Sequence, residues 1–366
     1  MTFFSMGFFD DEIAALKEKG LFRALPRTHP MTDGPVLNFC SNDYLGLAAD
    51  PRLKAAAKAA VDRYGAGSGA ARLISGNNAL CDELETALAD LKGAESALLF
   101  NSGYHANIGT IPALAGEGTV IFSDEWNHAS LIDGCRLSKA ETVVYRHHDL
   151  NELEARLQKT SKKKIIVTEA VFSMEGDVCP LDDLLNLAQK YGALVYLDEA
   201  HAVGVFGGDG EGLAPKNPPE NLICMGTLGK AFGSYGAFVS GSRSLRDYLV
   251  NKARSFIFTT ALPPAAAGAS LEAVSIVRKE RGRRQRLWDN VRRLGGKSPI
   301  RSVPIGPADQ TMEVSRRLLA EGFYVQGIRP PTVPEGTSRL RLTASASHTP
   351  DQIESILRAI RSLCTF

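Results

Sequence analysis

Short apolar runs alternate with longer amphipathic stretches through the middle of this chain, from about residue 78 to residue 241. The runs are almost continuously apolar and each ends in a polar turn, which is typical of buried parallel strands separated by helices. The pattern therefore predicts one large α/β domain around a mostly parallel sheet of seven strands. The predicted strands are 97–100, 119–122, 143–145, 164–168, 193–197, 222–225 and 237–240, and the predicted helices are 78–92, 104–115, 128–138, 149–159 and 181–190.

The two ends of the chain have looser patterns. Residues 11–25 predict a short amphipathic helix, and residues 37–46 predict a short strand that runs into a polar turn. The pair Asp50-Pro51 is a helix start signal, so a helix is expected over 51–63. A long helix is predicted at about 264–281, and strands and helices alternate loosely over 301–362. We therefore expect an N-terminal helix and strand segment (1–45), the large domain (46–262), and a linking helix with a small C-terminal α+β domain (263–366).

Charge and cysteine content narrow the class of protein. The 366 residues include 42 Lys and Arg against 41 Asp and Glu, for a net charge of +1. No global field therefore favours nucleic acid or an anionic membrane, and any anion must be bound locally. The six cysteines have no C-x-x-C pair, which argues against a zinc site and a disulfide framework and favours a reducing compartment. No apolar run reaches the length of a membrane span, about 18 residues, and the first 20 residues, which have no basic region before their apolar residues, predict neither a signal peptide nor a transit peptide, so a cytoplasmic location is expected.

Candidate chemistry begins at the end of the strand predicted at 193–197. Asp198 directly follows it, His201 comes three residues later, and Lys230 lies in a glycine-rich loop after the next predicted strand. An acid that keeps a pyridine nitrogen protonated and a lysine that forms a Schiff base are groups that pyridoxal phosphate (PLP) chemistry needs. Taken alone, each residue has another interpretation: an exposed loop lysine, a helix-capping or magnesium-binding acid, and a structural histidine. A nucleotide-binding P-loop is excluded, because Ala231 stands where that loop needs Ser or Thr.

Further residues could hold a phosphate and a substrate. Residues 102–105 open a predicted helix, where backbone N–H groups can bind an anion, and Thr227 can add a hydroxyl. His128 opens the next helix, and it either stacks on a flat ring or only starts the helix. Arg341 alternates with apolar residues on a late strand, and arginine suits bidentate carboxylate binding. Arg339 has the same parity and is the competing candidate.

These residues belong to a longer series of motifs that resembles the α-oxoamine synthase family of fold-type I PLP enzymes. The similarity extends from about Leu21 to His348, and the motifs occur in the family's order. It implies a large PLP-binding α/β domain, a small C-terminal α+β domain, and PLP as the cofactor. The motifs are Ser41–Gly46, Gly65–Gly69, Gly103–Tyr104, His128–Ser130, Thr168–Met174, Asp198–His201 and Thr227–Lys230.

The resemblance also implies roles for individual residues. Lys230 would bind PLP covalently, Asp198 would pair with its ring nitrogen, and His128 would stack on the ring and assist catalysis. These three are the expected catalytic residues, and no metal is expected. Because family members are homodimers with shared sites, Thr259 and Thr260 would reach a neighbouring subunit's phosphate. The expected cofactor-binding residues are Gly103, Tyr104, His128, Ser173, Asp198, His201, Thr227, Lys230, Thr259 and Thr260, and the expected substrate-binding residues are Arg23, Asn42, His128, Thr332 and Arg341.

A separate segment, Gly327–Pro334 followed by Arg339–Thr343, indicates the substrate. It most resembles the family members that condense L-alanine with a pimeloyl thioester, on CoA or on acyl carrier protein, for biotin synthesis. Members that join glycine to acetyl-CoA, or that make aminolevulinate or sphingoid bases, are the alternatives. A catalytically silent partner subunit is a more remote alternative, since it predicts the loss of the Schiff-base lysine and Lys230 is present.

Overall fold

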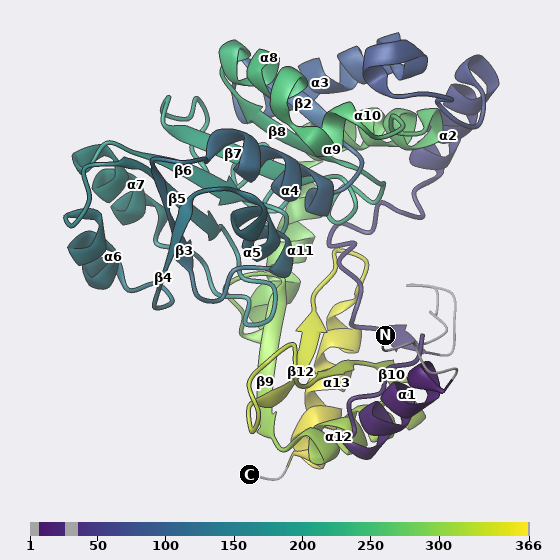
Figure 1. The fold of residues 1–366 in the computed structure, drawn as a ribbon. Helices are drawn as coiled ribbons and strands as arrows, with labels where there is room; N and C mark the ends of the chain where they lie inside the picture. Colours follow the sequence, from purple (N-terminus) through teal and green to yellow (C-terminus); the bar gives the residue numbers. More distant parts are fainter. Residues whose placement is uncertain (1–6, 26–35, 365–366) are drawn as a thin grey trace.

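The computed structural model describes residues 7–25 and 36–364, which form a large α/β domain and a smaller domain (Figure 1). Helix α11 (Arg281–Leu294) runs from the large domain towards the smaller one. The smaller domain contains the C-terminal strands and helices together with a strand from the N-terminal segment. The predicted fold class, a large α/β domain with a small C-terminal α+β domain, is confirmed.

Seven strands form the sheet of the large domain, in the order β2-β8-β7-β6-β5-β3-β4. β8 is antiparallel to both of its neighbours and the other pairs are parallel, so the predicted seven-stranded, mostly parallel sheet is confirmed. The strand order reverses at β3, because β4 lies on one side of it and β5 on the other. Open α/β sheets bind ligands beyond the carboxyl ends of the strands near such a point. The strands are β2 (Ser96–Phe100), β3 (Thr119–Asp124), β4 (Glu141–Tyr145), β5 (Lys163–Glu169), β6 (Ala193–Asp198), β7 (Leu222–Thr227) and β8 (Ala237–Gly241).

Helices cover both faces of this sheet, which explains why its strands are apolar throughout. The successive residues Ile165 and Ile166 of β5 belong to different hydrophobic clusters. Ile165 shares a cluster with Ile111 of α4 and Leu131 of α5, whereas Ile166 shares one with Leu153 of α6. Full burial of one such side chain contributes about 1.5–3 kcal/mol, so both faces stabilise the sheet. The helices are α4 (Gly103–Leu114), α5 (Ala129–Leu137), α6 (Leu150–Leu157), α7 (Leu181–Lys190), α8 (Arg243–Lys252) and α9 (Arg254–Ile257).

Three further helices pack together beside the edge strand β2: α2 (Pro51–Tyr64), α3 (Ala79–Lys92) and α10 (Pro264–Lys279). α2 begins where the sequence predicts, and the Asp50 side chain accepts a hydrogen bond from the backbone N–H of Arg52 at 3.0 Å. α10 approaches α2 closely at Gly268, where an added Cβ would lie 2.8 Å from the Cβ of Ala60. The absence of a side chain at Gly268 therefore allows the two helices to approach closely. A π-helical turn (Arg72–Gly76) precedes α3.

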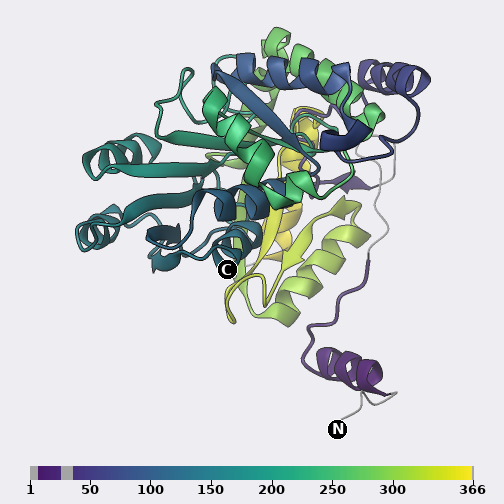
Figure 2. The same ribbon diagram turned by 45° about the horizontal axis from the view of Figure 1, so that its top comes forward.

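The long helix predicted at about 264–281 is confirmed as α10, which ends at Lys279. The backbone of Glu280 leaves the helical region (φ −100°, ψ 66°), and the basic residues that follow begin a second helix, α11, which was not predicted. The N-terminal helix, in contrast, was predicted too long. The helix predicted at 11–25 is α1 (Phe8–Glu18), and the chain turns at Gly20, which has a φ of 65°. α1 buries none of its side chains and lies away from the large sheet (Figure 2).

The small domain joins segments from both ends of the chain. β1 (Leu37–Asn38) pairs in parallel with β10 (Phe323–Tyr324), and a separate antiparallel sheet has the order β11-β12-β9. Its other elements are β9 (Ile300–Gly306), α12 (Ala308–Ala320), β11 (Gln326–Ile328), β12 (Ser338–Thr343) and α13 (Pro350–Leu363). The domain boundaries expected after residues 45 and 262 stay predictions. Among the helices of the described residues, none has both the length and the apolarity of a membrane span.

Candidate active site

The parallel strands bring four polar side chains to one edge of the large sheet. β3 ends at Asp124, β5 at Glu169, β6 at Asp198 and β7 at Thr227. β5 and β6 are neighbours, and Glu169 and Asp198 are partners in their register. Both carboxyl groups are buried, so each depends on hydrogen bonds or a nearby charge. The predicted catalytic residues lie around this pair.

Lys230 lies in the loop between β7 and β8, and its amine points back towards the strand ends. Its Nζ atom is 2.8 Å from Nε2 of His201. Burial lowers the pKa of Lys230 to about 8. The carboxylates of Asp198 and Glu169 oppose this shift, and the charge of Arg341 adds to it. A useful fraction of free amine is therefore present near neutral pH, and only the free amine can form a Schiff base.

Neutral donors hold the Asp198 carboxylate in place. Asn107 donates a hydrogen bond to its Oδ2 at 2.9 Å, and the backbone N–H of Ala200 donates to its Oδ1 at 2.8 Å. The hydroxyl of Tyr196 donates to Oδ1 of Asn107 at 2.8 Å, which orients that amide. A carboxylate held in this way is oriented to pair with a protonated ring nitrogen. Sequence reasoning missed Asn107, although an asparagine inside a helix is unfavourable and is a signal for a side-chain role.

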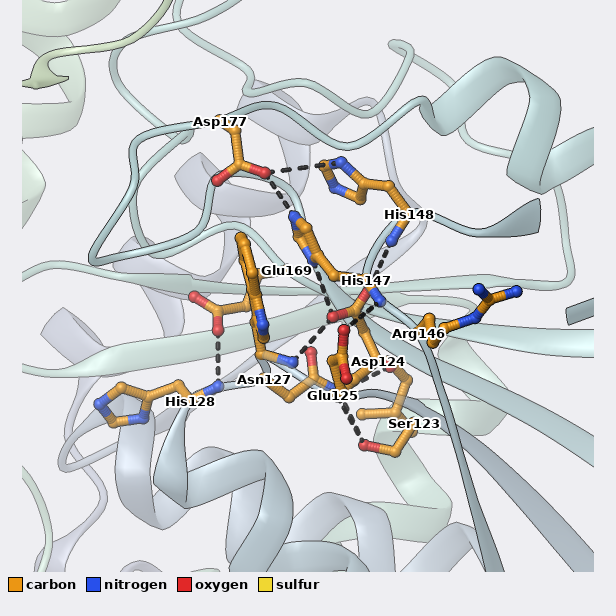
Figure 3. Close-up of polar contacts among 12 residues, drawn as sticks. Ser123, Asp124, Glu125, Asn127, His128, Arg146, His147, His148, Glu169 and Asp177 are labelled. Atoms are coloured by element: carbon orange, nitrogen blue, oxygen red, sulfur yellow. Dashed lines mark hydrogen bonds and ion pairs between the residues drawn. The ribbon is translucent and has the colours of Figure 1, made fainter. Parts of the chain in front are cut away.

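His128 caps the start of α5 beside the same carboxyl groups. Its Nδ1 is 2.8 Å from Oγ of Ser130, and its backbone N–H donates to Oε1 of Glu169 at 2.6 Å. Figure 3 shows this backbone bond, with the imidazole ring of His128 turned away from Glu169. Burial lowers the pKa of His128 although Asp198 opposes the shift, so a neutral, flat ring is available at neutral pH. Glu169 lies within a recognised motif, but the sequence alone assigned it no role.

The start of α4 provides the predicted anion-binding end of the site. Ser102 is its N-cap, and the Ser102 hydroxyl accepts a hydrogen bond from the backbone N–H of His105 at 3.2 Å. Gly103 and Tyr104 follow it, and the first N–H groups of a helix have no partner within the helix. Those amides are suitable donors for a phosphate. The phenol of Tyr104 is engaged elsewhere, because it donates to Asp133.

The predicted threonines belong to the loops around this end. Oγ1 of Thr227 donates to the carbonyl of Gly236 at 3.1 Å and accepts from a backbone N–H two residues on at 3.2 Å. The side-chain amide of Asn101 donates to Oγ1 of Thr259 at 3.1 Å and to the carbonyl of Thr260 at 2.8 Å. Thr259 and Thr260 therefore lie beside the end of β2, and their role towards a neighbouring subunit stays a prediction.

Arg341 is the arginine of β12 that joins the site, whereas Arg339 is engaged elsewhere. Arg341 donates from Nη2 to Oδ1 of Asn42 at 3.2 Å and from Nε to the carbonyl of Ser173 at 2.5 Å. Arg339 forms an ion pair with Glu175. Strand parity could not separate the two arginines, but their partners do. Asn42 and Ser173 thus meet Arg341, Ser173 through its backbone.

Arg23 and Thr332 meet at a cavity of about 440 Å³ in the small domain. Arg23 donates from Nη2 to the hydroxyl of Thr332 at 3.0 Å. Arg329 lines the same cavity and donates to the backbone of the N-terminal segment at 2.9 Å. Gln326, also in the wall, is the register partner of Arg341 across β11 and β12. The cavity therefore lies one strand away from the arginine of the main site.

A second histidine cluster lies at the ends of β3 and β4, drawn in Figure 3. Nδ1 of His147 is 2.9 Å from Asp124 and its Nε2 is 2.5 Å from Asp177. Burial alone would lower the pKa of His147, but the two carboxylates outweigh it and raise the pKa to about 9. His147, His148 and Asp177 place ligand-type atoms within 4.8 Å of one another. A protonated imidazole has no free lone pair, so the contacts describe an ion-pair bridge between strand ends.

The chain belongs to the family of class I and II aminotransferases, whose family model matches residues 34–360. It is a PLP-dependent enzyme of fold type I. The groups at the site fit this cofactor: an amine of lowered pKa, a buried carboxylate held by neutral donors, and the first N–H groups of α4. The expected cofactor and fold type are confirmed.

The relatives narrow this class. 8-Amino-7-oxononanoate synthase from Anaeromyxobacter dehalogenans is 47% identical over 375 residues, which cover 96% of this chain and 94% of the relative. The enzyme of the same name from Trichlorobacter lovleyi is 49% identical over 365 residues, which cover 93% of each chain.

Solved structures agree with this placement. Serine palmitoyltransferase from S. paucimobilis, with a bound PLP–myriocin adduct, has a TM-score of 0.90 at 31% identity, over 98% of both chains. 8-Amino-7-oxononanoate synthase from Francisella tularensis has a TM-score of 0.78 at 31% identity, over 89% of this chain and 97% of that one. The resemblance to the α-oxoamine synthases is thus confirmed.

Proposed function

We propose that this chain is an 8-amino-7-oxononanoate synthase, which condenses L-alanine with a pimeloyl thioester and releases CO₂ and a free thiol. Similarity to relatives of that name over nearly the whole chain supports this activity. The observation that carries the choice of substrate is the contact between Arg23 and Thr332, at a cavity one strand away from Arg341. The thioester would be presented on CoA or on acyl carrier protein.

Different residues of the main site would act on the cofactor and on different parts of the amino-acid substrate. PLP, when bound, withdraws electrons from the α-carbon of the substrate. Lys230 would hold the cofactor, and its free amine would remove the α-proton once the substrate has displaced it. Arg341 would bind the substrate carboxylate and orient the α-carbon. Asp198 would pair with the ring nitrogen, and the neutral ring of His128 would stack on the cofactor and assist the loss of CO₂.

The remaining predicted contacts surround the cofactor. Its phosphate would lie at the start of α4, against the N–H groups of Gly103 and Tyr104, with Thr227 beside them. His201 and Ser173 would meet its phenolic oxygen. The distance from Nζ of Lys230 to Nε2 of His201, 2.8 Å, supports the placement of His201.

The acyl chain of the proposed substrate needs its own binding group in the site. A pimeloyl group ends in a carboxylate, so it needs a cation some distance from the reacting carbon. Arg23 and Arg329 line the cavity of about 440 Å³ and supply two guanidinium groups. Ligand pockets commonly have volumes of about 300–1,000 Å³, so the cavity has room for a short chain. A terminal cation distinguishes pimeloyl from acetyl and palmitoyl groups.

A cytoplasmic homodimer with shared sites is the proposed assembly. Ile74 and Phe258 are 79% and 70% exposed, and the π-helical turn of Ile74 contacts α9, which precedes Phe258. Exposed large apolar side chains that gather in this way indicate an interface. Thr259 and Thr260 directly follow Phe258 and would serve the partner's phosphate. The six unpaired cysteines support a reducing compartment.

A substrate panel tests the reaction. Pimeloyl, heptanoyl, acetyl and palmitoyl thioesters are each combined with alanine, glycine and serine, and thiol release is measured. We expect alanine with the pimeloyl thioester to give the highest kcat/KM. A preference for glycine with acetyl-CoA, or for serine with palmitoyl-CoA, would refute the assignment and leave PLP chemistry at Lys230 standing.

Substitution of Arg23 tests the acyl cavity. Arg23→Gln removes a charge-assisted contact worth about 1.5–3 kcal/mol, so KM for the pimeloyl thioester should rise by about ten- to a hundredfold. Heptanoyl thioester has the same chain length without the terminal carboxylate, and its KM should change little. Equal changes for both thioesters would mean that Arg23 does not bind the terminal carboxylate.

A further inference from the structure

An unbroken series of side-chain contacts connects the substrate arginine to the catalytic lysine. Arg341 lies 3.2 Å from Asn42, and Asn42 lies 3.2 Å from the hydroxyl of Tyr44. The Tyr44 hydroxyl is 2.6 Å from Nδ1 of His201, and Nε2 of His201 is 2.8 Å from Nζ of Lys230. Tyr44 is completely buried and belongs to the motif Ser41–Gly46.

Chemistry limits the directions of these hydrogen bonds. Burial raises the pKa of Tyr44 to about 12, so its hydroxyl keeps its proton and must donate it. Burial, together with the charges of Lys230 and Arg341, lowers the pKa of His201 well below its usual value, so this ring is neutral and has one N–H. A neutral imidazole with a partner at each nitrogen accepts at one and donates at the other.

The distances favour one arrangement. The Tyr44 hydroxyl is closer to Nδ1 of His201 (2.6 Å) than to Oδ1 of Asn42 (3.2 Å), and Oδ1 of Asn42 already accepts from Arg341. If Tyr44 donates to Nδ1, the proton of His201 is on Nε2 and points at Lys230. An N–H in that position stabilises a nitrogen with a free lone pair and opposes its protonation. The opposite tautomer would favour the protonated lysine.

We propose that Tyr44 is a positioning residue that selects the Nε2–H tautomer of His201 and thereby keeps the nitrogen of Lys230 unprotonated. The proposal depends on PLP binding at Lys230. It does not depend on which amino acid or thioester the enzyme uses, so a different substrate would leave it standing.

Other charged groups also affect the protonation of His201 and Lys230. A test of Tyr44 must leave these charges unchanged. Asp198 and Glu169 favour a protonated Lys230, whereas Arg341 disfavours it. Lys230, Arg341 and His128 each disfavour a protonated His201. Tyr44 is the neutral member, so removing its hydroxyl changes no net charge in the site. Tyr44→Phe removes the hydrogen bond to His201 together with the contacts of the phenol to Asn42 and Arg341, so the tautomer of His201 must be measured beside the midpoint.

The first measurement is the pH midpoint of the visible absorption of the PLP-loaded protein, which reports protonation of the Lys230 nitrogen. Loss of one hydrogen bond in Tyr44→Phe should raise this midpoint by about half a pH unit to one unit. Tyr145→Phe is the matched control, because Tyr145 is also buried and lies outside the series; its midpoint should equal that of the wild type. An unchanged midpoint in Tyr44→Phe would refute the proposal, whereas a protein without a visible band would refute PLP binding itself.

The second measurement is the tautomer of His201, read from ¹⁵N chemical shifts of histidine-labelled holoenzyme. The chain has seven histidines, and the signal lost in His201→Gln identifies the relevant one. We expect Nε2–H in the wild type and in Tyr145→Phe; a wild-type Nδ1–H signal would overturn the proposal. If Tyr44→Phe fails to fold, a monofluorinated tyrosine at position 44 retains the hydroxyl and makes it a stronger donor. The midpoint should then move down, and an unchanged or raised midpoint would equally overturn the proposal.

Discussion

Two histidines lie just beyond strand ends of the same sheet, yet their charges differ. His201 follows β6 and its pKa is lowered well below the usual value, whereas His147 follows β4 and its pKa is raised to about 9. Burial lowers the pKa of both rings. His147 also lies between the carboxylates of Asp124 and Asp177, which outweigh burial. Lys230, Arg341 and His128 each disfavour a protonated His201, and they add to the effect of burial.

The difference in protonation between His201 and His147 gives the two histidines different roles at the edge of the sheet. A neutral His201 has one proton and one lone pair, so it can pass a hydrogen-bond preference from Tyr44 to Lys230. A protonated His147 has two donors and no lone pair, so it ties Asp124 on β3 to Asp177 in the loop after β5. The same residue type therefore orients the reactive lysine at one place and joins structural elements at the other. The charged groups around each histidine determine which of these two roles it has.

The largest effect should be on activity, and should come from removing the amine of Lys230 beside the neutral His201. Lys230→Ala leaves no group to bind PLP covalently or to remove the α-proton. We expect thiol release to fall by at least about 10⁴-fold, the upper end of what acid–base catalysis contributes. Borohydride should fix PLP to the wild type and to the exposed-lysine control Lys279→Ala, but not to Lys230→Ala. Residual activity above about 1% would assign the catalytic amine to another residue.

The second-largest effect should be on the free energy of unfolding, through the protonated ring of His147. The pKa of His147 is about 9 in the folded protein, and an unfolded histidine titrates near 6.5. The stabilisation is therefore complete below about pH 6.5 and is lost as pH rises through about 9, with a maximum of about 3 kcal/mol. His147→Gln should lower the free energy of unfolding by about 2–3 kcal/mol at pH 6 and by much less at pH 9.5. Urea unfolding of the PLP-loaded protein measures this, and a difference independent of pH would contradict the charged state of His147.

The smallest effect concerns the neighbour of this histidine. His148 has a φ of 56°, a left-handed backbone that asparagine tolerates better, and its ring stacks on His147 at 3.8 Å. Burial and the charge of His147 lower the pKa of His148, so folding loses stability as pH falls below about 6.5. His148→Asn should raise the free energy of unfolding by up to about 1 kcal/mol, more at pH 5.5 than at pH 8. A loss of stability at pH 5.5 would show that the stacked ring stabilises the cluster.

Much of the fold was predictable because its signals are local. Apolar runs with polar turns located all seven strands of the large sheet, and Asp50-Pro51 located the start of α2. The second helix, α11, was not predicted, because basic residues suit the end of one helix and the surface of the next equally well. The N-terminal helix was predicted too long, since its amphipathic pattern continues past the turn at Gly20.

By itself, the sequence determined the cofactor, the family and the residues available at the strand ends, because these depend on residue type and spacing along the chain. Lys230, Asp198 and His201 could be named in this way. The family resemblance already named Arg341 rather than Arg339, and the tertiary structure added the different partners of the two arginines. Only the tertiary structure decided that Asn107 holds Asp198 and that Tyr44 meets His201. Those contacts join residues far apart in sequence, and the sign of a histidine's pKa shift follows from such contacts. No pattern along the chain contains that information, since burial and partner charge exist only once the segments have come together.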